Sequence, residues 1–221
     1  MAERNFAPDT PALREKWGDF AWDAARAKAA ADILTRYPAG RQASASISFL
    51  DLAQRQVGEM TDTQGWLPIP VIEFVARELD MPPVRVMEVA SFYTMFNLAP
   101  VGKFHVQVCG TTPCMLRGSD DVLSACYKRG LKKGHTTADG LFTLTEVECL
   151  GACTNAPMVQ INDDNYEDLT ESSMKAILDA LAMGQTPKPG PQVARQTSCP
   201  EGGPTTLKKM AERNYDYRGQ Q

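Results

Sequence analysis

Four of the chain's six cysteines form two closely spaced pairs, and this pattern restricts the possible folds more than any other feature of the sequence. The pairs are Cys109 with Cys114 and Cys149 with Cys153. Four residues lie within the first pair, three lie within the second, and 34 residues separate the pairs. Apolar and polar residues alternate from Phe104 to Val108, which predicts a β-strand that ends at Cys109. Residues 142–148 predict a second strand, which ends at Cys149. Two such strands side by side in one sheet would bring four thiols to one edge.

Four thiols at one edge have three chemical interpretations. The two tetrahedral irons of a 2Fe–2S cluster require four thiolates. Zinc also binds four cysteines, often with about two to four residues within a pair. The third interpretation is a set of buried or redox-active thiols without a metal. Gly110 and Gly151 let backbone N–H groups approach sulfur closely, and Thr111 and Thr112 add hydroxyl donors, which favours the cluster.

The charge of the chain is unevenly distributed. The net charge is −4, of which residues 186–221 contribute +3, so residues 1–185 carry −7. This acidic body argues against a nucleic-acid-binding protein, because affinity for nucleic acid depends largely on Lys and Arg paired with phosphates. No run of about 18 apolar residues is present, so we expect no direct membrane insertion. The start, MAERNFAPDT, has no apolar signal core, which predicts free thiols rather than structural disulfides.

The sequence also lacks the short motifs of nucleotide-binding and hydrolytic enzymes. Neither G-x-G-x-x-G nor G-x-x-x-x-G-K-[ST] occurs. The nucleophile motif G-x-S-x-G is absent as well. We therefore expect no catalytic residue on this chain and no binding of NADH, flavin or ATP by this chain alone.

The hydrophobic pattern predicts an α+β protein with two domains and a tail. Residues 1–98 predict a bundle of short helices, one of which covers residues 48–57 and is stopped by Gly58. Residues 99–185 predict a compact layer with the order β-α-β-β-α. Residues 186–221 contain five prolines and no periodicity, which predicts an extended Pro/Gly-rich tail that only a partner would order.

Beyond the cysteines, several segments resemble the small 2Fe–2S subunits of respiratory NADH dehydrogenase, complex I. These segments are Ser91–Asn97, Pro100–Lys103 and Ala156–Asn162, together with both cysteine loops. The resemblance covers roughly residues 10–183, and the four-cysteine pattern matches position for position. It implies a thioredoxin-like ferredoxin domain behind a helical N-terminal domain. It also implies one 2Fe–2S cluster held by Cys109, Cys114, Cys149 and Cys153.

The resemblance further implies an electron-transfer subunit of NADH:quinone oxidoreductase. FMN and NADH are then expected on a flavoprotein partner subunit, and this chain would contact that subunit and others of the peripheral arm. The expected location is peripheral, on the cytoplasmic side of the bacterial inner membrane, or on the matrix side in mitochondria. One alternative is the equivalent diaphorase subunit of an NAD-linked hydrogenase or formate dehydrogenase. Another is a zinc-stabilised protein-interaction module.

Other residues near the cysteine pairs have plainer interpretations. Cys126 lies on an apolar helix face as a small core residue, and Cys199 is expected to be an unliganded thiol. His105 has no second histidine at the spacing that a Rieske centre requires. Glu146 and Glu148 either form an exposed strand face or add negative charge that lowers the cluster's reduction potential.

Aromatic residues of the helical part are predicted to dock the flavoprotein. They are Trp17, Phe20, Trp22 and Trp66. Large aromatic side chains often dominate interface energetics. The alternative is that they fill the core of their own bundle.

Overall fold

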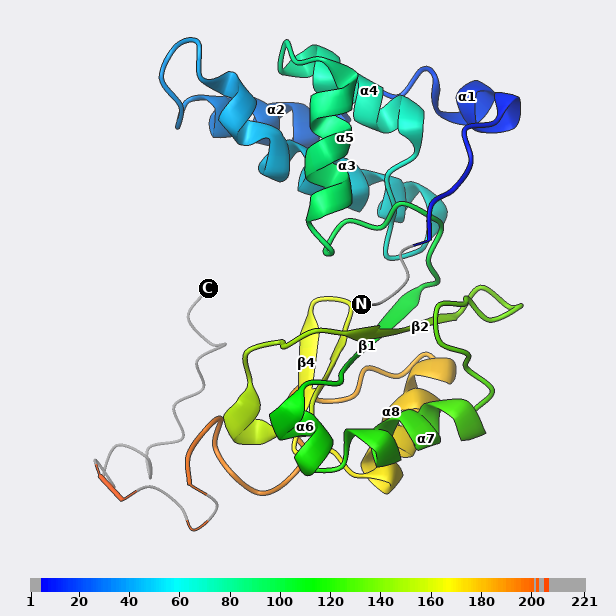
Figure 1. The fold of residues 1–221 in the computed structure, drawn as a ribbon, viewed down its shortest axis with the longest axis vertical. Coiled ribbons are helices and arrows are strands. Elements are labelled where there is room, and N and C mark those ends of the chain that lie inside the picture. Colours follow the sequence, from blue (N-terminus) through cyan, green and yellow to red (C-terminus); the bar gives the residue numbers. More distant parts are fainter. Residues whose placement is uncertain (1–4, 201, 203–204, 207–221) are drawn as a thin grey trace. The chain divides into compact units, whose positions relative to one another are not determined.

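The computed structural model describes residues 5–200, 202 and 205–206 (Figure 1). The chain forms two compact units. The first contains the chain up to Val106 together with Gly130–Thr145, and the second contains Gln107–Arg129 together with the chain from Glu146 onward. Among the described residues, every helix is too short or too polar to span a bilayer.

Within the described residues, the first unit contains five α-helices and one short 3-10 helix. They are α1 (Pro11–Trp17), α2 (Ala24–Leu34), η1 (Gln42–Ala45), α3 (Ser46–Thr61), α4 (Ile69–Glu78) and α5 (Pro83–Phe92). Short polar side chains define where two of them begin. Thr10 Oγ1 accepts a hydrogen bond from Leu13 N–H at 3.3 Å, and Asp23 Oδ1 accepts one from Arg26 N–H at 2.8 Å. These bonds satisfy backbone donors that have no partner within the helix.

The core of the first unit is apolar and draws on all five of these helices. Phe49 and Leu50 of α3 and Val71 and Val75 of α4 are at most 1% exposed. These positions follow the helical repeat, so each helix buries one apolar face against its neighbours. Burial of this face, rather than intrinsic helix propensity, stabilises such short helices.

The four aromatic residues predicted to dock a partner belong to this packing. Trp17, Phe20 and Trp66 are 2%, 7% and 6% exposed. Trp22 packs edge-on against Phe74, with ring centroids 5.0 Å apart. Trp17, Phe20 and Trp66 fill the space between the helices, so the prediction that they bind the flavoprotein is wrong. Trp22 is only partly buried, and for this residue the prediction stays untested.

Gly58 lies inside α3, so the prediction that it stops the helix is wrong. A Cβ atom on residue 58 would lie 2.8 Å from the carbonyl oxygen of Thr63. The turn after the helix thus packs directly on the helix backbone, and only glycine leaves room for it. The helix continues to Thr61 and is followed by the capping residue Asp62, whose φ of 51° is left-handed.

Five strands form one sheet in the described part of the chain, with the order β2-β1-β3-β4-β5. They are β1 (Phe104–Cys109), β2 (Phe142–Val147), β3 (Val159–Ile161), β4 (Asp164–Glu167) and β5 (Gly190–Pro191). β3 and β4 form an antiparallel hairpin in which Val159 pairs with Tyr166. β5 runs parallel to β4 and pairs Gly190 with Tyr166.

β1 and β2 run in the same direction. At one end, Phe104 N–H donates to Leu141 O at 2.8 Å, and at the other end Gly110 N–H donates to Val147 O at 3.2 Å. Both strands lead into a cysteine loop at their carboxyl ends. Because the carboxyl ends of parallel strands meet at one edge of a sheet, the two loops meet there, as the sequence predicts.

The second unit adds helices to the sheet. They are α6 (Thr112–Leu116), α7 (Ser119–Lys128), η2 (Cys153–Asn155) and α8 (Glu171–Ala182). α7 and α8 pack on each other, and Arg129 pairs with Asp179 at 3.0 Å between them. Figure 1 shows the two helices side by side. Thr170 caps α8 by accepting a hydrogen bond from Ser173 N–H at 3.2 Å.

We predict that Gly58→Ala destabilises the protein. In an open helix position, alanine stabilises a helix by about 1 kcal/mol relative to glycine. Here we expect the opposite sign, a loss of about 1–3 kcal/mol in the free energy of unfolding, because the new methyl group would press on Thr63 O. Urea denaturation of variant and wild type measures the difference.

Met60→Ala is the matched control, since Met60 lies in the same helix and is 61% exposed. It should change the free energy of unfolding by less than about 0.5 kcal/mol. A Gly58→Ala variant as stable as the wild type, or more stable, would contradict the packing role of Gly58.

Candidate metal centre

The first cysteine pair is buried at the end of β1. Cys109 is the last residue of this strand, Cys114 lies in α6, and each is 1% exposed. Cys109 N–H donates to Met158 O at 3.3 Å, which fixes the strand end beside the residues that precede β3. The short α6 turns the chain back, so the thiols of Cys109 and Cys114 share a hydrogen bond.

The second pair follows β2 and is exposed. Cys149 comes two residues after the end of β2, and Cys153 is the first residue of η2. Their sulfur atoms lie 3.8 Å apart. Two sulfur ligands about 2.3 Å from a tetrahedral metal ion are themselves roughly 3.8 Å apart. The second pair therefore already has the spacing of two ligands on one metal ion.

Cys109 has a lowered pKa although it is buried. Burial by itself raises the pKa of this thiol, but hydrogen bonds from the hydroxyl and N–H of Thr111 and from Leu150 N–H outweigh it. The Thr111 hydroxyl lies 3.3 Å from the sulfur. Such donors stabilise the thiolate, which is the form that binds metal. Leu150 belongs to the loop of the second cysteine pair, so this loop donates a hydrogen bond to a sulfur atom of the first pair and stabilises its thiolate.

Cys114 and Cys153 resist ionisation. Burial, followed by the hydrogen bond with Cys109, raises the pKa of Cys114 to about 11. The hydrogen bond with Cys149, followed by burial, raises the pKa of Cys153. Negative charge on Cys109 raises both pKa values further. Four thiolates in this place repel one another, so they require bound positive charge, as metal ions provide.

The grouping of the sulfur atoms suits a cluster of two metal ions. Among the described residues, no three or more His, Cys, Asp and Glu side chains gather closely enough to hold a single ion. The four predicted ligands come together as two pairs, each joined by a sulfur–sulfur contact. In a 2Fe–2S cluster each of two tetrahedral irons takes two thiolates. The residues present fit that group.

The Glu146 side chain lies against the loop between Cys109 and Cys114. A Cβ atom on residue 110 would meet the Glu146 carboxylate, so this carboxylate lies against the backbone of Gly110. Glu148, by contrast, is exposed to solvent. Of the two acids, Glu146 is the one held beside the backbone that follows a predicted ligand.

Two further candidates lie in apolar surroundings. Cys126 is 0% exposed in α7, and burial raises the pKa of its thiol to about 12. His105 is 8% exposed, burial lowers its pKa to about 4, and its Nε2 lies 2.9 Å from Thr145 Oγ1. Both are uncharged at neutral pH, as core residues usually are.

Sequence reasoning missed α6 and, although it expected backbone donors to sulfur, it did not identify which residues supply them. Thr111-Thr112-Pro113 contained a signal for the helix, since threonine before proline commonly begins one. The N–H groups of Leu150 and Met158, which donate to Cys109 and Cys114, had no such signal. Any residue type carries an N–H group, so only the fold decides which ones reach a sulfur atom.

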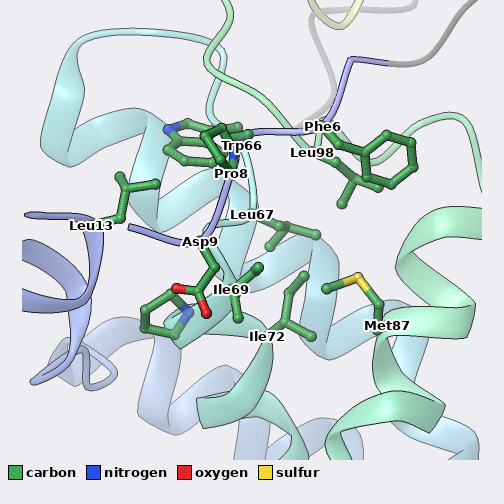
Figure 2. Close-up of a pocket in the computed structure, with 12 residues that line it drawn as sticks. Phe6, Pro8, Asp9, Leu13, Trp66, Leu67, Ile69, Ile72, Met87 and Leu98 are labelled. Carbon is green, nitrogen blue, oxygen red and sulfur yellow. The ribbon is translucent and has the colours of Figure 1, made fainter. Parts of the chain in front are cut away.

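The first unit contains a small pocket (Figure 2). Its volume is about 30 Å³, and Phe6, Trp66, Leu67, Ile72 and Leu98 are among its lining residues. Figure 2 shows mainly apolar side chains around it, with the carboxylate of Asp9 at one side. Sites for small molecules usually have volumes of at least about 300 Å³. This pocket has room for about one water molecule.

Known proteins are similar to this chain in sequence and in fold. Residues 30–182 match the model of the thioredoxin-like [2Fe-2S] ferredoxin family. The NADH-quinone oxidoreductase E subunit of Rickettsia bellii is 54% identical over 170 residues, which cover 76% of this chain and 98% of that protein. Its counterpart in Rickettsia felis is 55% identical over 162 residues, 73% of this chain and 93% of that protein.

A solved structure resembles the fold. It is the NAD+-reducing [NiFe]-hydrogenase in the air-oxidized state, with a TM-score of 0.52 and 18% sequence identity. The similarity covers 65% of this chain and 24% of the hydrogenase chain. At this identity the likeness shows a shared fold and no more.

We predict that serine in place of Cys109, Cys114, Cys149 or Cys153 lowers the iron and acid-labile sulfide content or changes the spectrum of the bound centre. The wild-type chain should contain about two irons and two labile sulfides, as a 2Fe–2S centre requires. Metal analysis, visible absorption and electron paramagnetic resonance of the reduced protein measure this.

Cys126→Ser and Cys199→Ser are the controls, and both should keep the iron content and the spectrum of the wild type. Loss of the centre in Cys199→Ser, with an unchanged spectrum in Cys153→Ser, would require a different ligand set. One tightly bound zinc without labile sulfide in the native protein would exclude the cluster.

Proposed function

This chain belongs to the family of thioredoxin-like [2Fe-2S] ferredoxins, and we propose that it is the 2Fe–2S electron-transfer subunit of an NADH:quinone oxidoreductase. Cys109, Cys114, Cys149 and Cys153 are its proposed cluster ligands. The observation that carries this proposal is the meeting of two thiol pairs at one sheet edge in a chain that is 54% identical to the Rickettsia bellii protein over 98% of that protein's length.

A bound 2Fe–2S cluster supplies one-electron chemistry, because it accepts and releases single electrons. The residues around the cysteines set the conditions for this step. The Thr111 hydroxyl and the N–H groups of Thr111, Leu150 and Met158 donate to sulfur, which stabilises negative charge there. Burial of Cys109 and Cys114 keeps water from one side of the site, whereas the second pair faces outward.

The electron donor is proposed to be a flavin on another subunit. The chain has no glycine-rich nucleotide motif. We propose that NADH and FMN bind a flavoprotein partner, that this chain contacts it together with other subunits, and that the assembly lies on the cytoplasmic side of the bacterial inner membrane. In a mitochondrion the corresponding side is the matrix.

The fold alone also fits a diaphorase subunit of an NAD-linked hydrogenase or formate dehydrogenase. The NAD+-reducing hydrogenase shares this fold at 18% identity, whereas the Rickettsia proteins share 54% and 55% of their residues with this chain. The much higher identity favours NADH:quinone oxidoreductase. Copurification of membrane subunits, rather than of a nickel-containing subunit, tests this choice.

We predict that Glu146→Gln raises the midpoint potential of the cluster. The substitution removes one negative charge beside the first loop while keeping the shape of the side chain, and less negative charge favours the reduced form. The expected rise is on the order of tens of millivolts, since a tenfold change in a one-electron equilibrium corresponds to about 59 mV. A redox titration followed by electron paramagnetic resonance measures it.

Glu148→Gln is the control and should shift the potential less, because solvent and salt screen an exposed charge. The wild-type potential should lie well below the values of Rieske centres, since four thiolates leave the cluster negatively charged. A positive wild-type midpoint, or a fall in potential in Glu146→Gln, would contradict this electrostatic account.

We predict that NADH alone does not reduce the isolated chain, whereas NADH with the flavoprotein subunit does. Without its own nucleotide site the chain must receive electrons from the flavin of its partner. Loss of visible absorbance after NADH addition measures reduction, and gel filtration measures complex formation. Dithionite should reduce the isolated chain, which controls for an intact cluster.

This experiment tests the choice of complex separately from the cluster assignment. Reduction of the isolated chain by NADH would place a nucleotide site on this chain. Failure to bind the flavoprotein, with a cluster that dithionite still reduces, would exclude the proposed complex and leave the cluster assignment intact.

A further inference from the structure

Part of the Pro-rich tail is bound to the second unit. We call residues 186–199 the strap. Tyr166 Oη donates to Pro187 O at 3.4 Å, and Gln192 N–H donates to Glu167 O at 2.9 Å, so the strap extends the sheet beside β4. The sequence predicts a tail that only a partner would order, but this segment has its partners within the chain.

Arg195 anchors the strap through a buried ion pair. Its Nε donates to Asp168 Oδ2 at 2.8 Å, and its Nη2 donates to Asp168 Oδ1, so the pairing is bidentate. Each of the two side chains is only 9% exposed. Arginine makes such planar two-point contacts with a carboxylate, which fixes orientation as well as distance. Asp168 thus sets the position of the guanidinium.

The same guanidinium holds the loop that carries Cys153. Arg195 Nη2 also donates to Thr154 O at 3.0 Å, and Nη1 donates to Cys199 O at 3.2 Å. Thr154 directly follows Cys153. One side chain therefore joins the strap, the β4–α8 turn and the backbone next to a proposed cluster ligand.

Asn155 provides a second connection between the strap and this loop. It is 1% exposed, and its Nδ2 donates to Thr197 O at 3.0 Å and to Glu167 Oε2 at 2.7 Å. Its backbone carbonyl oxygen accepts a hydrogen bond from Asp168 N–H at 2.7 Å. Both residues that follow Cys153 are thus bound on the side of the strap and the β4–α8 turn.

Cys153 needs such support from outside its own element. It is exposed and begins η2, a 3-10 helix of three residues. A helix of one turn is not stable by itself. The bonds to Thr154 and Asn155 are what hold the backbone that presents the Cys153 sulfur.

We propose that Arg195 is a positioning residue for the cluster: with the strap, it holds the Thr154–Asn155 backbone so that Cys153 stays in place to bind iron. This inference rests on the proposed role of Cys153 as a ligand. The family match ends at residue 182, so the strap lies outside it, whereas Thr154, Asn155 and Asp168 lie inside. A part of the chain beyond the shared ferredoxin sequence thereby secures the most C-terminal of the four proposed ligands.

The test compares the full chain with its Arg195→Gln, Arg195→Lys and Arg129→Gln variants. Arg129 is the matched control, because it makes an ion pair with Asp179 in the same unit but is 39% exposed. We expect iron release to a chelator to be at least about tenfold faster in Arg195→Gln, the usual effect of removing a group that supports a metal ligand. Its electron paramagnetic resonance spectrum in the reduced state should also change.

Arg195→Lys should fall between Arg195→Gln and the wild type, since lysine keeps the charge but not the two-point geometry. Arg129→Gln should match the wild type. In the chain stripped of metal, backbone amide exchange over residues 153–156 should be faster in Arg195→Gln than in the wild type. This last readout does not depend on a cluster.

Unchanged iron release and spectrum in Arg195→Gln would overturn the proposal, as would equal losses in Arg195→Gln and Arg129→Gln. If Arg195→Gln does not fold, Arg195→Lys decides by the same measurements, and wild-type behaviour of that variant overturns the proposal. A wild-type chain without iron and labile sulfide would refute the proposed function instead. In that case amide exchange still shows whether Arg195 holds the loop.

Discussion

Repulsion among four sulfur atoms is the constraint on which the second unit depends. Burial is the main cause of the raised pKa of Cys114, the hydrogen bond with Cys149 is the main cause of the raised pKa of Cys153, and negative charge on Cys109 adds to both. Thiolates gather at such a place only when cations compensate their charge. The protein therefore has to hold the sulfur atoms close by other means: the parallel strands β1 and β2, the turn of α6 and the bonded residues after Cys153. Two irons bound by these four cysteines, as proposed, would supply the compensating positive charge.

The two pairs meet this constraint in different ways. Cys109 and Cys114 are buried, and N–H groups of Leu150 and Met158 are directed at their sulfur atoms. Cys149 and Cys153 are exposed and depend on the backbone around them for their position. In one half of the site, fixed hydrogen-bond donors thus offset the cost of burying thiolates, whereas the other half is exposed to solvent.

Local signals in the sequence predict this edge of the sheet well. Cysteine spacing and strand alternation can each be recognised within a few neighbouring residues, and the resemblance adds the thioredoxin-like fold, which the family match confirms. The sequence does not show which residues far apart in the chain come into contact. The spacing around Gly58, the burial of Trp17 and the pairing of Arg195 with Asp168 all depend on which segments meet after folding. Periodicity describes one element at a time and does not contain that information.

The position of Arg195 near the C-terminal end also sets an order of events during synthesis. Domains form from the N-terminal side as the chain leaves the ribosome, so all four cysteines and Asp168 emerge before Arg195 does. Until then, Asp168 lacks its cation and the turn after Cys153 lacks the strap. In a nascent chain, the backbone after Cys153 therefore lacks these bonds until Arg195 has been translated and has left the ribosome.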